Sequence, residues 1–79
     1  MDELSQLEKR LAAAERRVAE AGKLVALQGE LVAKLESDGR DATTARKLLV
    51  SFAQSLAQVV GERDRIIRER ERVARRGTR

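Results

Sequence analysis

Hydrophobic residues recur along most of the chain at alternating steps of three and four positions, which is the spacing of a coiled-coil seam. The first series occupies residues 4–35 and has Gln28 as its only polar member, and the second occupies residues 45–73. No proline interrupts either series. The spacing predicts two long amphipathic helices, over residues 3–36 and 43–75.

The two predicted helices are separated by a polar segment, residues 37–42, that is typical of a chain reversal. Gly39 can adopt the left-handed conformation that ends many helices, and Asp38 precedes it. Asp41, or a threonine after it, can accept a hydrogen bond from the first free N–H groups of the second helix. A connection this short predicts an all-α fold, an antiparallel two-helix coiled-coil hairpin, with a short basic tail at residues 76–79.

A register for the hairpin also follows from the pattern. If the numbers of facing residues add up to about 77, the seam positions of one helix meet those of the other, as in Leu11 opposite Ile66 and Val18 opposite Val59. The residues predicted to hold the hairpin together are Leu4, Leu7, Leu11, Val18, Ala21, Val25, Val32, Leu49, Phe52, Leu56, Val59, Ile66 and Val73.

The chain has more apolar surface than one two-helix seam can cover. Further apolar side chains lie beside both seams, and a stripe this wide is typical of helices in bundles. Ordering some 70 residues costs roughly 100 kcal/mol of conformational entropy, which a single seam does not offset. We therefore predict a homodimer that forms a four-helix bundle, with a helical partner protein as the alternative. The predicted interface residues are Leu24, Leu27, Leu31, Leu48, Val60 and Ile67.

Alanine and glycine recur at helical spacing on the side of the first helix away from its leucines. Small side chains let another backbone approach closely, but alanine is also a good helix former on a solvated surface. Glycine inside a helix costs roughly 1 kcal/mol relative to alanine, so the glycines indicate either close contacts or a flexible middle. The residues are Ala12, Ala19, Gly22, Ala26, Gly29 and Ala33.

Residues 22–69 contain three distinctive features, namely the turn sequence LESDGRD at residues 35–41, Phe52 and the RDR sequence at residues 63–65. With these features the segment resembles a group of short uncharacterised proteins from alphaproteobacteria, which show patterns such as LERDGHDT and DRDRLL. Arg40 stands where the group often has histidine. The group has no established function, so the resemblance implies a helical hairpin of bacterial origin.

The side chains present exclude several kinds of chemistry. The 79 residues include no Cys, His, Pro, Trp or Tyr. Disulfides, thiolate or imidazole metal sites, and Ser-His or Cys-His catalysis are therefore excluded. Asp38 and Asp41 flank Gly39 but lack the spaced oxygen ligands and closing glutamate of a calcium loop. We predict no catalytic residue, no metal site, no cofactor and no enzymatic activity.

Charged residues make up 38% of the chain, and their balance changes along it. Residues 1–62 carry nine Lys or Arg against ten Asp or Glu, whereas residues 63–79 carry eight against three. Five arginines of the second segment follow one another at steps of three and four, so a helix would align them in a stripe suited to phosphate groups. The stripe consists of Arg65, Arg68, Arg72, Arg75 and Arg79.

The alternative is that these arginines are solvated and neutralised by their neighbours. Asp64, Glu69 and Glu71 lie four residues from Arg68, Arg65 and Arg75 respectively, and cations near a helix C-terminus are favoured by the helix dipole. The chain lacks the aromatic platforms on which single-stranded bases stack. We therefore rank nucleic-acid binding behind protein association.

No segment approaches the roughly 18 consecutive apolar residues of a membrane helix, and the charged start MDELSQLEKR is unlike a secretory signal. A cytoplasmic location is expected. The sequence predicts a non-enzymatic protein-protein interaction or assembly module that self-associates. The alternative is a small nucleic-acid-associated protein that uses the arginine stripe.

Overall fold

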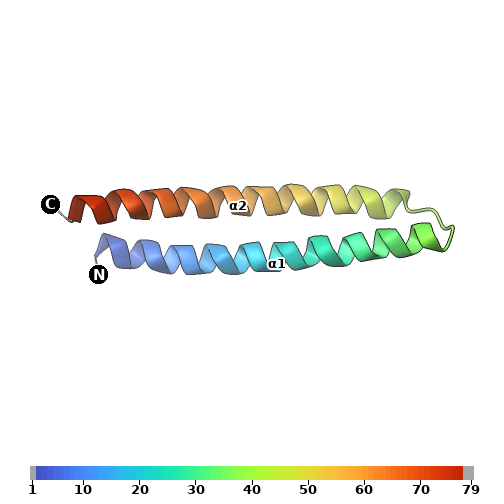
Figure 1. The fold of residues 1–79 in the computed structure, drawn as a ribbon, viewed down its shortest axis with the longest axis horizontal. Coiled ribbons are helices and arrows are strands. Elements are labelled where there is room, and N and C mark those ends of the chain that lie inside the picture. The colour runs from blue at the N-terminus through green and yellow to red at the C-terminus, as the bar shows by residue number, and fades with distance from the viewer. Residues whose placement is uncertain (1, 78–79) are drawn as a thin grey trace.

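The computed structural model describes residues 2–77, which form two α-helices joined by a short turn (Figure 1). α1 spans Glu3–Ser37 and α2 spans Thr43–Gly77. The helices pack side by side in opposite directions and form a rod 63 Å long and 15 Å wide. The predicted all-α antiparallel hairpin is confirmed. The start of α1 and the end of α2 lie together at what we call the open end, opposite the turn.

Both helices extend slightly further than the sequence predicts. α1 ends at Ser37, one residue later, and α2 continues to Gly77, two residues beyond the predicted range. The reason is that no proline or glycine stops α2 before Gly77 in its last turns. Residues 76–77 of the predicted tail are therefore helical, and residues 78–79 lie outside the described part of the chain.

The turn ends α1 through the conformation expected of Gly39. Gly39 has a φ of 69° and is the one described residue with a positive φ. Its N–H donates to the carbonyl of Glu36 at 3.1 Å, and the N–H of Arg40 donates to the carbonyl of Leu35 at 2.8 Å. These two bonds form a Schellman motif, which satisfies carbonyl groups that the end of a helix leaves without a helical donor.

Aspartate side chains satisfy N–H groups at the start of both helices. The Oδ1 atom of Asp41 accepts from the N–H of Thr43 at 3.0 Å and from its hydroxyl at 2.6 Å. These bonds, the hydroxyl bond first, favour the carboxylate and lower the pKa of Asp41 below its usual value. Asp2 accepts from the N–H of Ser5 at 2.7 Å at the start of α1. The capping oxygen at the turn is therefore that of Asp41.

Every position of the two predicted seams is buried or half-buried, while most positions between them are exposed. Packing is firmest near the open end, where Leu11, Ala14 and Ile66 form a buried cluster, with Leu11 and Ile66 together as the predicted register requires. Nearer the turn, Val32 and Ala42 are buried. Between these regions the seam is only half-buried, at Val18, Ala21, Val25, Leu49, Phe52, Leu56 and Val59.

Gln28, the polar member of the first seam, is buried with its amide paired. Its Nε2 atom donates to the carbonyl oxygen of Ala45 on α2 at 3.1 Å. A buried amide without a partner is destabilising, so this bond favours the alignment that places Gln28 beside the first turn of α2. Among the described residues, no buried side-chain nitrogen or oxygen lacks a hydrogen-bond partner.

Candidate interaction surfaces

Ion pairs between the helices identify two edges of the hairpin, one on each side of the seam. Arg17 pairs with Glu62 at 3.3 Å, and Arg46 pairs with Glu36 at 2.7 Å beside the turn. Arg17 lies one position before a seam residue and Glu36 one position after a seam residue, which places the two pairs on opposite edges. Residues seven positions apart lie on the same edge, so each edge can be followed along the rod.

The edge of the Arg17 pair becomes apolar toward the turn. Leu24 and Leu31 follow Arg17 at steps of seven residues. On α2, Leu48 precedes Glu62, the partner of Arg17, by two such steps. Leu27 lies between the first two leucines at helical spacing. These four side chains are between 44% and 62% exposed. We call Leu24, Leu27, Leu31 and Leu48 the leucine edge.

The opposite edge carries small side chains. Gly29 and Gly22 precede Glu36 on α1 at steps of seven residues. Ala53 and Val60 follow Arg46 on α2 at the same spacing. A β-carbon added to Gly22 or Gly29 would meet no atom within 4 Å. No close approach inside the hairpin therefore requires glycine at these positions. We call this the small-residue edge, formed by Gly22, Gly29, Ala53 and Val60.

The other residues predicted for an oligomer interface do not lie on the leucine edge. Ile67 is half-buried and packs against the buried cluster that contains Leu11, so it contributes to the core of its own chain. Val60 is half-buried on the small-residue edge. Val50 is not among the interface residues predicted from the sequence, yet it is 56% exposed. Its spacing of four residues from Arg46 places it on the side of the small-residue edge.

Charged and apolar residues are segregated along the length of the rod. The turn half, residues 18–61, has five basic and five acidic residues, and residues 48–61 include none of either. The open half, residues 2–17 with 62–77, has eleven basic and eight acidic residues, a net charge of +3. The firmest packing is also in the open half, around Leu11. The leucine edge therefore lies in the half that has no net charge and that does not contain the buried cluster of Leu11.

The predicted arginine stripe lies on a continuous stretch of helix. α2 remains helical to Gly77, so the described arginines of the stripe share one face of it. Arg79 lies outside the described residues. The stripe arginines that the structure describes are all exposed, namely Arg65, Arg68, Arg72 and Arg75.

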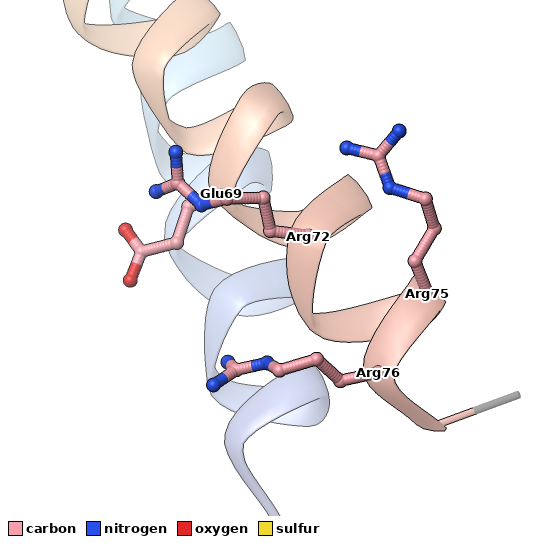
Figure 2. Close-up of a pocket in the computed structure, with 4 residues that line it drawn as sticks. All are labelled: Glu69, Arg72, Arg75 and Arg76. Carbon is pink, nitrogen blue, oxygen red and sulfur yellow. The ribbon is translucent and has the colours of Figure 1, made fainter. Parts of the chain in front are cut away.

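A shallow hollow at the open end is lined mainly by arginine. Arg72, Arg75 and Arg76 fan out around it from the last turns of α2, together with Glu69 (Figure 2). Arg76 extends toward α1 and pairs with Glu3 at 3.6 Å. The hollow therefore adds one basic group, Arg76, to the end of the stripe.

Two of the three ion pairs predicted to neutralise the stripe, Asp64 with Arg68 and Glu69 with Arg65, do not form among residues 2–77. Asp64 pairs with its neighbour Arg63 at 3.0 Å, not with Arg68. Nor do Arg65 and Arg72 form an ion pair with any carboxylate of residues 2–77. Exposed pairs contribute little free energy, so spacing alone does not determine which of them form. Three guanidinium groups of the stripe are consequently open to an external anion.

The described residues contain no group of three or more His, Cys, Asp or Glu side chains placed to hold a metal ion. In the turn, Asp38 pairs with Lys34 at 3.5 Å and Asp41 bonds to Thr43, so both carboxylates have structural partners. No helix within residues 2–77 is long and apolar enough to cross a membrane.

Comparison of the chain with family models, with curated proteins and with solved structures gives no match. The resemblance to the alphaproteobacterial group stays a prediction. The features of this chain that bear on function are therefore the leucine edge, the small-residue edge and the arginine stripe.

Proposed function

We propose that this chain is a non-enzymatic assembly module that associates with a second copy of itself through the turn half of the hairpin. The observation that carries the proposal is the leucine edge, where four leucine side chains, each about half exposed, gather in a region of no net charge. Contiguous apolar patches on a protein surface mark interaction sites.

The exposed surface of the single chain also supports association. The hairpin exposes 5911 Å², whereas a compact monomer of 8.8 kDa exposes roughly 4,800 Å². The excess of about 1,100 Å² exceeds the roughly 800 Å² that each partner covers in a standard protein interface. Two helices cannot enclose a core by themselves, and the half-buried seam around Phe52 and Leu56 reflects this. A second hairpin would cover what the first leaves open.

Replacing Leu24 and Leu31 by glutamate tests the proposal. Each leucine is about half exposed, so covering it contributes roughly 1 kcal/mol, and the double variant removes four such contributions from a symmetric dimer. The dissociation constant should rise about a thousandfold for this loss of about 4 kcal/mol. Light scattering and analytical ultracentrifugation measure the mass, and circular dichroism measures the helicity that falls with dissociation.

Val50→Glu is the matched control for this experiment. Val50 is 56% exposed, in the same half of the rod but on the side of the small-residue edge. The variant introduces glutamate at a comparably exposed apolar position, with one added charge per copy against two in the double variant, and should leave the dimer intact. A wild-type chain that remains a folded monomer at high micromolar concentration would refute the proposal. Equal dissociation in the Val50 variant would show that association does not use the leucine edge.

A second candidate function is the binding of nucleic-acid phosphates through the arginine stripe. The observation that favours it is the set of three exposed arginines, Arg65, Arg68 and Arg72, that form no ion pair with a carboxylate of the described residues. The helix spreads them over about 10 Å. Each phosphate contact releases about 0.9 counterion from duplex DNA, so binding should be weak, independent of sequence and steeply salt-dependent.

A triple substitution by glutamine separates the two readings of the stripe. The variant Arg65→Gln with Arg68→Gln and Arg72→Gln should abolish a mobility shift of duplex DNA at about 50 mM salt, while helicity and dimerisation stay unchanged because these positions lie off the seam. The matched control removes three charges elsewhere, on α1, through Arg10→Gln, Arg16→Gln and Lys23→Gln. Absence of a shift with the wild-type chain would rule out the second candidate.

A further inference from the structure

We propose that two hairpins pair leucine edge to leucine edge while pointing in opposite directions. Only their turn halves overlap, and the two open ends project from opposite ends of a longer rod. This inference rests on the proposed self-association. It adds the surface that each copy uses, the relative direction of the copies and the length over which they overlap.

Pairing of like edges follows from what each edge carries. The leucine edge holds four of the five large apolar side chains that are most exposed among the described residues. If it contacts the same edge of a second copy, both leucine edges are covered at once and the dimer closes. If it contacted the small-residue edge, each pair would leave one free edge of each kind, and further copies would add without limit. The closed pair therefore removes the largest apolar surface with the fewest copies.

The distribution of charge determines the direction. With both turns at the same end, two open halves of net charge +3 would lie side by side, and the Arg17 and Glu62 pair of each copy would face the contact. Like charges repel, and charged groups lose hydration in an interface. With the turns pointing in opposite directions, the two turn halves face each other and each has equal numbers of basic and acidic residues. The open halves then move apart.

The position of the leucine edge determines the overlap. Its residues centre near Leu27, so the two-fold axis passes close to Leu27, and Leu24 of one copy lies level with Leu31 of the other. The overlap then extends from the turn to the level of Arg17, where the ion pair with Glu62 ends the apolar part of the edge. This distance is about 20 residues of α1, or about 30 Å. Two rods of 63 Å that overlap by this length form a dimer about 95 Å long.

Two measurements on the full chain test the arrangement. Small-angle X-ray scattering gives the maximum dimension of the dimer, and spin labels, one on each copy, give the distance between the copies' open halves. Because the chain has no cysteine, Gln6→Cys places one label per copy at an exposed position of the open half. We expect a maximum dimension of about 95 Å and a separation between labels of about 60 Å, since Gln6 lies about 21 residues from the axis. With both turns at the same end, the length would stay near 63 Å and the labels would lie within about 30 Å.

Each outcome separates this inference from the function on which it rests. A dimer with the long dimension and the long label distance supports it. A dimer of near 63 Å with the short label distance overturns the orientation and leaves self-association standing, whereas a monomer overturns both. Growth into larger assemblies, or loss of the dimer when Gly22 and Gly29 are both replaced by alanine, would place the small-residue edge in the contact and overturn the pairing of leucine edges.

Discussion

Replacing glycine by alanine should have opposite effects at two places in this hairpin. Gly22 and Gly29 lie inside α1, and a β-carbon added at either position meets no atom within 4 Å. Gly39 also has open space around it, but its φ is 69°. The same change of one carbon therefore separates the effect of backbone conformation from the effect of packing.

The magnitudes follow from these two environments. At Gly22 and Gly29, alanine reduces the freedom of the unfolded chain and meets no neighbour, so the double variant should be roughly 1–2 kcal/mol more stable. For a domain of this size, each kcal/mol raises the Tm by roughly 4–8 °C. At Gly39, alanine must adopt the left-handed conformation, which lowers stability by roughly 1–2 kcal/mol.

Urea unfolding followed by circular dichroism measures both changes. The titrations are repeated at several protein concentrations, because the stability of a dimer depends on concentration. The double variant at Gly22 and Gly29 should shift the midpoint upward, and Gly39→Ala should shift it downward. A downward shift for the double variant would refute the reasoning, since it would mean that another surface packs against the glycines. An unchanged midpoint for Gly39→Ala would mean that the turn does not need its left-handed residue.

Three further predictions concern the seam and the turn. Cysteines in place of Val18 and Val59 should form an intramolecular disulfide under mild oxidation, detected by mass spectrometry, because the register puts them within the roughly 7 Å between Cα atoms that the bond requires. Gln28→Leu should change the free energy of unfolding by less than about 1.5 kcal/mol but should loosen the alignment of the helices, seen as broadened NMR signals. The lowered pKa of Asp41 means that its contribution to stability is complete above about pH 4 and is lost as the pH falls through the lowered value, so Asp41→Ala should weaken the acid dependence of the urea midpoint.

The hairpin could be predicted from the sequence because its determinants are local and periodic. The seam spacing requires only that apolar residues recur on one face, and Gly39 is the residue type that most readily takes the φ of the turn. The end of α2 was predicted two residues too early, at residue 75, although nothing in the sequence stops the helix before Gly77. Helix ends depend on such local stops, so small errors at the ends are expected where stops are weak.

The arrangement of the surfaces could be predicted only in part. The pattern located Val60 and Ile67 beside the second seam. Whether such a residue packs inward depends on the side chains opposite it. Ile67 packs against the buried cluster that contains Leu11, so it belongs to the core of its own chain. The partner of Asp64 could not be predicted either, since Arg63 and Arg68 are both within reach and exposed ion pairs differ by only about 1 kcal/mol or less. Long exposed side chains are therefore the least predictable part of the candidate site.

The salt dependence of self-association should reveal the relative direction of the two copies. The described part of each open half has a net charge of +3, and the turn half has none. If the copies point in opposite directions, the open halves are separated by more than the Debye length of about 10 Å at 0.1 M salt, so the dissociation constant should vary by less than about threefold between about 50 and 500 mM sodium chloride. If both turns lay at one end, salt would screen the repulsion and tighten the dimer. The variant Arg65→Gln with Arg68→Gln and Arg72→Gln removes the net charge of the open half and should leave the dissociation constant at low salt unchanged. A dimer that tightens about tenfold in this variant would contradict the opposite orientation, because only open halves that lie side by side would gain from the loss of charge.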